Sequence, residues 1–227
     1  MPIPSPALLE PRKTPVQARS TASVDAILEA TIQVLLAIGK ERLTTARVAR
    51  RAGVSIGTLY QYFPNKSSLL QAALRRHLDA VATAVEFVCQ EQKGSTLAEM
   101  ATALIQTFLE AKMGDGKAGA ALYAVSADVD GVNIAKQMSA RINQAVVEML
   151  ITARDPLKTD PVLAAFILQG CIAGVSRRLL ESEDPKKQRA SVQDELTSLT
   201  CSYLEEGSGA TGGIITQNQS CPITDIL

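Results

Sequence analysis

The chain has 227 residues, 46% hydrophobic and 20% charged, enough for one large or two small domains with a real core. Its four cysteines form no CxxC pair and it has one histidine, so we expect free thiols and no metal or other cofactor. Redox sensing by one thiol stays an alternative. The net charge is zero, but residues 1–80 carry 11 Lys and Arg against 5 Asp and Glu, and residues 81–227 carry 12 against 18. This division predicts a basic part that faces a polyanion, with scattered surface charge as the alternative.

Both ends of the chain lack hydrophobic periodicity. Residues 1–19 hold five prolines and three cations, and residues 206–227 are rich in Gly, Ser and Thr, so we expect two disordered tails. Prolines stand where a secretory peptide has its apolar segment, and we find no apolar stretch of the roughly 20 residues that cross a bilayer. We therefore expect a cytoplasmic protein without membrane contact.

Helical periodicity recurs between the tails, whereas strand patterns are nearly absent. A first helix is predicted over Thr21–Ile38, with Gly39 as its stop, followed by short helices over 45–51 and 56–62. A long helix, roughly 40 Å, is predicted from Lys66 toward Gly94. We expect one domain over 20–66 and a second over 67–205.

The predicted second domain contains signals for the starts and ends of helices. "TLAE" at 96–99 is a capping box, "GDG" at 114–116 breaks the helix that follows, and further helices are predicted near 117–127 and up to Met149. Three Asp-Pro pairs, at 155–156, 160–161 and 184–185, are alike: Asp can cap a helix while Pro takes its first position. The whole pattern predicts an all-α protein of about nine helices.

The helix after Asp160 is apolar nearly all the way round over residues 161–175. Such a helix needs cover on both sides, which predicts a self-association surface shared with the last helix. A central core helix is the alternative. The predicted dimer residues are Ala164, Gly170, Ala173, Gly174, Leu196, Leu199 and Tyr203.

The two short helices have the signals of a helix-turn-helix. In "LTTARVARRAGVS", Thr44 can cap the first helix and Gly53 can adopt the left-handed conformation of the turn. Ser55 can then cap a second helix whose outer positions are small or polar. In a helix-turn-helix this second helix enters the major groove of DNA.

The segment "TTARVARRAGVSIGTLYQYFPNKSSLL", between a first and a long helix, resembles the DNA-binding domain of the TetR family of transcriptional regulators. The resemblance covers about residues 20–70. It implies a three-helix helix-turn-helix domain followed by a larger helical ligand-binding and dimerisation domain. It also implies that Leu59 and Phe63 are core residues and that the DNA-binding residues are Thr45, Arg47, Ser55, Ile56, Gly57, Thr58, Tyr60, Gln61 and Lys66. Ile56 departs from the family, which often has a polar residue there.

The resemblance further implies a regulator, most often a repressor, that binds a palindromic operator in double-stranded DNA as a homodimer. A small-molecule inducer would release it, with the long helix from Lys66 as the lever. Candidate ligand contacts on the later helices are Phe108, Met113, Tyr123, Met138, Asn143 and Phe166, for each of which plain core packing is the alternative. His77 is expected at the surface.

The sequence also bears on other function classes. The chain has no GxSxG, HExxH, P-loop or GxGxxG pattern, so we predict that it is not an enzyme. A DNA-binding protein without a ligand, and a regulator controlled by a protein partner, both stay open. Arg12, Lys13 and Arg19 are either a minor-groove arm or solubilising charges.

Overall fold

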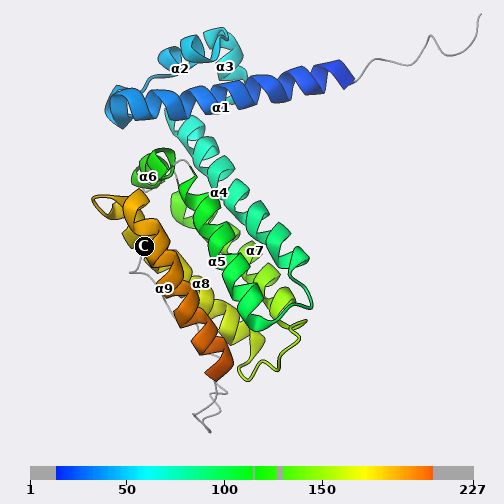
Figure 1. Ribbon diagram of the computed structural model, residues 1–227. Coiled ribbons are helices and arrows are strands. Elements are labelled where there is room, and N and C mark those ends of the chain that lie inside the picture. The colour runs from blue at the N-terminus through cyan, green and yellow to red at the C-terminus, as the bar shows by residue number, and fades with distance from the viewer. Residues whose placement is uncertain (1–13, 115, 127–129, 207–227) are drawn as a thin grey trace, which may run out of the picture. The chain divides into compact units, whose positions relative to one another are not determined.

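The computed structural model describes residues 14–114, 116–126 and 130–206, and the regular secondary structure in these ranges is helical throughout (Figure 1). Nine helices lie within them, as expected. They are α1 (Thr14–Arg42), α2 (Thr45–Ala52), α3 (Ile56–Tyr62), α4 (Lys66–Glu91), α5 (Leu97–Met113), α6 (Gly116–Ala124), α7 (Gly131–Leu150), α8 (Pro161–Glu181) and α9 (Pro185–Glu206). Of the predicted tail at 206–227, Glu206 is the last residue of α9, and residues 207–227 lie outside the described residues, as do the cations Arg12 and Lys13.

Two compact units make up the chain, residues 1–73 and 74–227, and the boundary between them lies inside α4. The boundary expected from the sequence, after residue 66, lies at the start of the same helix. The first unit contains α1, α2, α3 and the first turns of α4. The second contains the rest of α4 and α5 to α9.

Helix α1 begins at Thr14, earlier than the predicted start at Thr21. The last N-terminal proline, Pro15, stands in its first turn, where a missing N–H is harmless, and no other proline occurs before Pro64. The predicted disordered arm is therefore helical from residue 14 onward. Gly39 interrupts the helical geometry with φ 74° and ψ 168°, at the predicted stop.

The core of the first unit is formed by apolar side chains from all four of its helical segments. It includes Ile27, Leu28, Leu43, Val48, Leu59, Phe63 and Leu70, all buried. Helix α2 packs on both α1 and α3. The short helices α2 and α3 bury few residues of their own, and the packing of α2 on the long helix α1 stabilises them.

In the second unit, α5 packs against α6, α7, α8 and α9, and α8 packs against α7 and α9. The predicted capping box is present: Glu99 N donates to Thr96 Oγ1 at 3.3 Å and Thr96 N donates to Glu99 Oε2 at 2.8 Å. Because α5 supplies Leu97, Met100, Leu104, Ile105 and Leu109 to the interior, it is the central helix of this unit.

The three Asp-Pro pairs differ in the structure, although their sequences are alike. Asp160 and Asp184 cap α8 and α9, accepting from Leu163 N at 2.9 Å and Lys187 N at 3.1 Å. No helix begins after Asp155. Its carboxylate instead accepts from Leu97 N at 3.0 Å and caps α5 from a distant part of the chain.

Two helices correct the expectation that no segment is long and apolar enough to cross a membrane. Residues Ser20–Arg42 of α1 and residues Pro161–Glu181, which form α8, meet that criterion by length and composition. Core helices of soluble proteins meet it as well. Helix α1 buries Ile27, Leu28 and Leu35 in the first unit, and α8 buries Ala165, Leu168 and other residues in the second.

Candidate functional site

Side-chain and backbone caps fix the turn between α2 and α3. Thr44 Oγ1 accepts from Arg47 N at 3.3 Å, and Gly53 ends α2 in the left-handed conformation with φ 70°. Ser55 Oγ accepts from Thr58 N at 2.9 Å and so begins α3. These are the three capping positions that the sequence predicts, and together they set the direction of α3.

Helix α3 has one buried and one exposed face. Leu59 and Phe63 are buried in the core, as predicted, and tether the helix. Gly57 and Gln61 are exposed, Ile56 is 42% exposed and Tyr60 49% exposed. The helix therefore presents its first residues and its middle to solvent, as a recognition helix must.

Hydrogen bonds between helices orient several of the predicted DNA contacts. The Tyr60 hydroxyl lies 3.0 Å from Thr45 Oγ1, which ties the middle of α3 to the start of α2. The exposed Arg47 donates to the carbonyl of Arg42 at 2.7 Å. Thr58 is half-buried, and its hydroxyl lies 2.8 Å from Ser55 Oγ.

Lys66 lies in a less accessible position than the other predicted contacts. Its ammonium group donates to the carbonyl of Lys40 near the end of α1, and the side chain is half-buried. An ammonium group has three donors, so two remain for a phosphate. Lys66 therefore both fixes the start of α4 and keeps a positive charge there.

The surroundings of α2 and α3 are basic. No acidic residue occurs between Glu41 and Asp79, whereas Arg47, Arg50 and Arg51 are all exposed on α2. Arg51 is oriented by Gln33, to which it donates at 2.7 Å. An exposed helix start flanked by cations is suited to contact with a phosphate backbone.

In the second unit, side chains from four helices meet around a buried lysine that sequence reasoning missed. Lys112 of α5 is only 6% exposed, and its Nζ donates to Ser176 Oγ of α8 at 2.9 Å. The same Nζ lies 5.4 Å from the ring centroid of Phe108 and 5.1 Å from that of Tyr123 on α6. His77 of α4 meets Tyr123 edge to face at 6.0 Å.

Burial shifts the pKa values of this cluster toward the neutral forms. It lowers the pKa of Lys112 to about 8, helped by the positive charge of Arg177. It also raises the pKa of Tyr123 to about 12. Lys112 occupies the buried stripe of α5, one turn after Phe108. A lysine at an inward-facing position of an amphipathic helix is the sequence signal that indicates such a site.

The six predicted ligand contacts are not gathered at one place. Phe108 and Tyr123 belong to the Lys112 cluster. Met138 is buried, but its sulfur accepts from Arg141 at 3.5 Å, and Met113 is a buried residue of α5. Asn143 Oδ1 is buried without a hydrogen-bond partner among the described residues.

Two side chains lie differently from the positions expected from the sequence. Phe166, predicted as a ligand contact, is 62% exposed on α8 rather than turned inward. The reason is that 161–175 is apolar on all faces, so composition did not say which face points inward. His77, expected at the surface, is half-buried against Tyr123.

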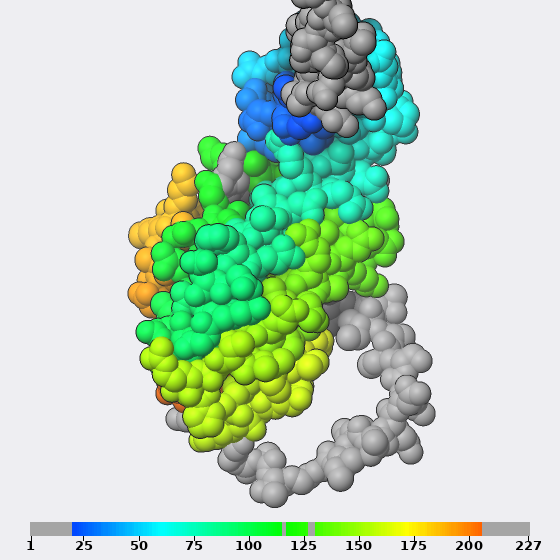
Figure 2. All heavy atoms as spheres, turned by 90° about the vertical axis from the view of Figure 1, so that its right-hand side faces the viewer, coloured from blue at the N-terminus to red at the C-terminus, as the bar shows by residue number. Residues whose placement is uncertain are grey.

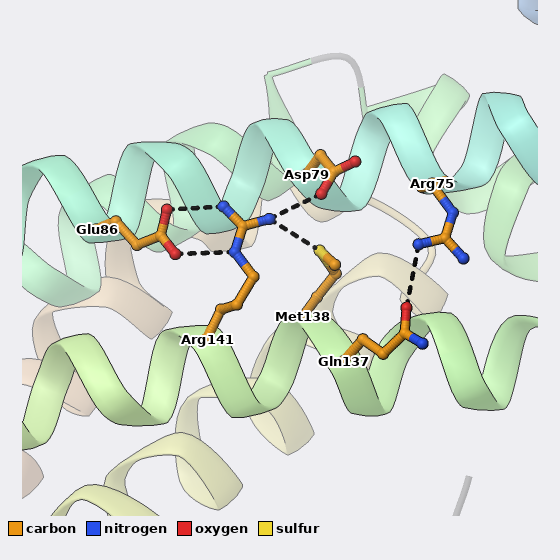
Figure 3. A network of polar contacts seen from close by, with 6 residues as sticks. All are labelled: Arg75, Asp79, Glu86, Gln137, Met138 and Arg141. Carbon is orange, nitrogen blue, oxygen red and sulfur yellow. Dashed lines mark hydrogen bonds and ion pairs between the residues drawn. The ribbon is translucent and has the colours of Figure 1, made fainter.

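A charged network joins α4 to α7, which lie next to each other on the face shown in Figure 2. Arg141 donates to Glu86 through Nε at 2.9 Å and Nη2 at 2.7 Å, and through Nη1 to Asp79 at 2.8 Å (Figure 3). Arg75 donates to Gln137 at 3.1 Å nearby. The hydrogen bonds from Arg141 lower the pKa of Glu86.

An open groove of about 500 Å³ beside Arg141 is lined largely by polar side chains, unlike a typical ligand pocket.

The predicted dimer residues divide into exposed and buried ones. Gly170, Ala173 and Gly174 are exposed on α8, and Leu199 is 58% exposed on α9. Tyr203 is half-buried. Ala164 and Leu196 are buried within the chain itself, so they have no surface to offer a partner. Val162, Leu163 and Phe166 extend the exposed apolar stripe of α8.

The sequence matches two described families. Residues 27–73 match "Bacterial regulatory proteins, tetR family", and residues 96–204 match "Tetracyclin repressor-like, C-terminal domain". The first match contains α2 and α3, and the second contains α5 to α8 and most of α9.

Solved structures share the fold. A putative TetR-family transcriptional regulator from Mesorhizobium loti superposes with a TM-score of 0.66 at 18% identity, covering 83% of this chain and 98% of the other. A transcriptional regulator from Rhodococcus sp. Rha1 superposes with a TM-score of 0.65 at 20% identity, covering 84% of this chain and 100% of the other.

Curated relatives include nucleoid occlusion factors. SlmA from Glaesserella parasuis is 36% identical over 72 residues, which are 32% of this chain. The match spans about a third of that relative, 34% of its length. SlmA from Salmonella paratyphi B is 27% identical over 150 residues, which is 64% of this chain and 76% of that protein.

Proposed function

Because this chain belongs to the TetR family of transcriptional regulators, whose members are DNA-binding proteins and not enzymes, we propose that it is a repressor that binds a palindromic operator as a homodimer. In this proposal a small-molecule inducer releases it from DNA. We place it in the cytoplasm, where it has access to DNA. The observation that supports DNA binding is the start of α3, which is capped and exposed.

The chemistry of α3 gives each residue a role on DNA. Gly57 allows close approach of the helix to the backbone, and Thr58, Tyr60 and Gln61 offer hydroxyl and amide groups to phosphates or base edges. Ile56 can contact a thymine methyl group but cannot read guanine. Arg47 and Lys66 contribute charge to phosphate binding.

Two copies of α3 are needed for specificity. A seven-residue helix reads only a few base pairs, so two half-sites about 34 Å apart are required. The exposed stripe of α8 together with Leu199 supplies the surface for self-association. Its glycines and alanine permit close packing of helices, and covering Phe166 and Leu163 removes apolar area from water.

Helix α4 is the proposed route of communication. It begins at Lys66, beside the DNA-binding residues, and contributes His77 to the Lys112 cluster without an interruption in the helix. An inducer that binds two forms of the dimer with affinities differing by a few kcal/mol shifts their populations sufficiently. The form it favours then holds its two α3 helices at a spacing that does not fit the operator.

A second candidate is a DNA-binding regulator controlled by a protein partner. The 27% identity to a nucleoid occlusion factor over 150 residues favours it, since that similarity extends beyond the DNA-binding segment. Exposed apolar side chains outside the dimer stripe, Phe87 on α4 and Ile151 after α7, are available to such a partner. A DNA-binding protein without any ligand stays the third possibility.

Selection of binding sites from a random duplex pool tests the first proposal. The selected site should be a palindrome, and in gel-shift titrations at physiological salt it should bind far more tightly than a scrambled duplex of the same composition. Light scattering should give the mass of a dimer. Equal affinity for both duplexes, or a strictly monomeric particle, contradicts the proposal.

A further inference from the structure

Lys112 is a buried cation that no described carboxylate neutralises. Lys93, Arg141, Arg177 and Arg189 are among the cations of the second unit that form ion pairs, whereas Lys112 has no carboxylate partner among the described residues. Its one described hydrogen bond goes to Ser176, whose hydroxyl in turn donates to the carbonyl of Ala173 at 2.9 Å. Buried charges in proteins are normally paired, so this arrangement needs an explanation.

Packing alone does not explain the lysine. A methionine would fill a similar volume beside Phe108 and Tyr123 without the cost of removing a charge from water. The two aromatic rings offset part of that cost through cation–π attraction, but they hold no full negative charge. The ammonium group would be fully compensated only in a state in which an anion lies next to it.

The walls around Lys112 restrict what that anion can be. Phe108 and Tyr123 are aromatic, and His77 packs against Tyr123. The Lys112 ammonium group is almost fully buried, and the Ser176 hydroxyl is its hydrogen-bond partner. The site therefore matches one negative charge carried by an apolar body, and it does not match a phosphate or another strongly hydrated polyanion.

Helix α6 covers the lysine with small residues. A Cβ atom at Gly119 would lie 3.2 Å from the Lys112 carbonyl oxygen and 3.4 Å from His77 Nε2, so the backbone of α6 approaches both residues closely. Because Lys112 is almost fully covered, a molecule can reach it only if some of the residues that cover it move. Binding there thus couples to a rearrangement of the helices around Lys112, of which α6 is one.

We infer that Lys112 is the charge-recognising residue of the inducer site and that the inducer is a small organic monocarboxylate with an aromatic or aliphatic body. This inference rests on the proposed function, in which a small molecule binds the second unit. The carboxylate accepts a hydrogen bond from Lys112 Nζ, and the rings of Phe108 and Tyr123 contact the apolar body. Lys112 then gains the anionic partner that the described residues lack.

The test uses matched pairs of acids and amides on the purified full chain. Sodium benzoate, phenylacetate, hexanoate and decanoate are each compared with their neutral primary amide in thermal-shift and calorimetric titrations. At least one carboxylate should raise the melting temperature while its amide does not. Lys112→Met should weaken binding of that carboxylate about tenfold or more, since it removes a charge-assisted hydrogen bond. Lys117→Met, at an exposed lysine on α6, is the matched control and should bind as the wild type does.

A second readout does not depend on any variant. In NMR spectra of protein labelled with ¹³C-lysine, the Lys112 Cε resonance should titrate at a raised pH midpoint when the carboxylate is bound, because an anion favours the charged form. Equal responses to acids and amides, no response to any of the four carboxylates, or an unchanged preference in Lys112→Met would overturn the inference. None of these measurements contains DNA, so a failure of operator binding is distinguished from a failure here.

Discussion

The Thr45 hydroxyl and the Tyr60 phenol lie 3.0 Å apart, so the first residue of α2 holds an exposed ring in the middle of α3. This contact orients a predicted DNA-binding side chain before DNA arrives. Pre-organisation of this kind lowers the ordering cost of binding.

Tyr60→Phe and Thr45→Val should therefore each weaken operator binding by about threefold to tenfold, the equivalent of roughly 1 kcal/mol for one hydrogen bond. Because the two hydroxyl groups act as a pair, the double variant should lose little more than either single variant. Fluorescence anisotropy on a selected operator measures all four proteins. Fully additive losses would show that the two side chains act independently.

Two glycines near the turn should respond in opposite ways to alanine. Gly53 has φ 70°, so Gly53→Ala should destabilise the protein by about 1 kcal/mol in urea unfolding. Gly57 has ordinary helical geometry, and an added Cβ would meet only Ser55 Oγ at 3.7 Å. Gly57→Ala should leave stability unchanged or slightly higher and should weaken DNA binding. Normal DNA binding by Gly57→Ala would exclude close approach of the backbone at this residue.

Lys112→Met should stabilise the ligand-free protein, because it removes a buried charge without a described counter-ion. The folded pKa of about 8 lies below the ordinary lysine value of 10.5, so the unfolded chain binds more protons between these two pH values. The free energy of unfolding of the wild type should therefore rise, relative to Lys112→Met, from pH 8 to 10.5. Below pH 8 the free energy of unfolding of the variant should exceed that of the wild type by the full amount, on the order of a few kcal/mol. Urea unfolding at several pH values checks both the sign and the window.

Arg141→Ala should destabilise the second unit, since it removes a bidentate bond to Glu86 and a bond to Asp79. All three side chains are partly exposed, so we expect about 1 kcal/mol, with a smaller effect at high salt. The pKa of Glu86 is lowered, so the contribution of this pair should be present above the ordinary glutamate pKa and lost as the pH falls below it. Arg189→Ala, which breaks one ion pair of 3.4 Å, is the control and should matter less.

Phe166→Glu and Leu199→Glu should convert the dimer to monomers, because each places a charge in the apolar stripe proposed for self-association. Light scattering at several protein concentrations measures the effect. Phe87→Glu changes an equally exposed residue of α4 and should leave the dimer intact. A dimer that survives both stripe variants would place the interface elsewhere.

Local signals made much of the first unit predictable. The caps at Thr44 and Ser55 and the left-handed Gly53 depend on residues within a few positions in the chain, and the structure has all three. The capping box at Thr96 was predictable for the same reason. The buried tethers of α3, Leu59 and Phe63, came from the family resemblance.

The features that could not be predicted from the sequence depend on tertiary contacts. Asp155 resembles Asp160 and Asp184 in sequence, but it caps a helix 58 positions away, and no local pattern encodes that partner. Lys112 looks like an ordinary surface lysine until the packing of α6 and α8 on α5 encloses it. The exposure of Phe166 could not be predicted, because a uniformly apolar helix does not reveal which of its faces is covered.

The chain passes from one unit to the other inside α4, with no linker at the boundary after Ala73. A single inserted residue there would rotate everything that follows by about 100° and displace it by about 1.5 Å along the axis. A chimaera that joins the first unit of this chain to the second unit of another protein must therefore preserve the helical phase of α4 at the junction. Insertions of seven residues, which return to within about 20° of the original direction, are the shortest that come close to doing so.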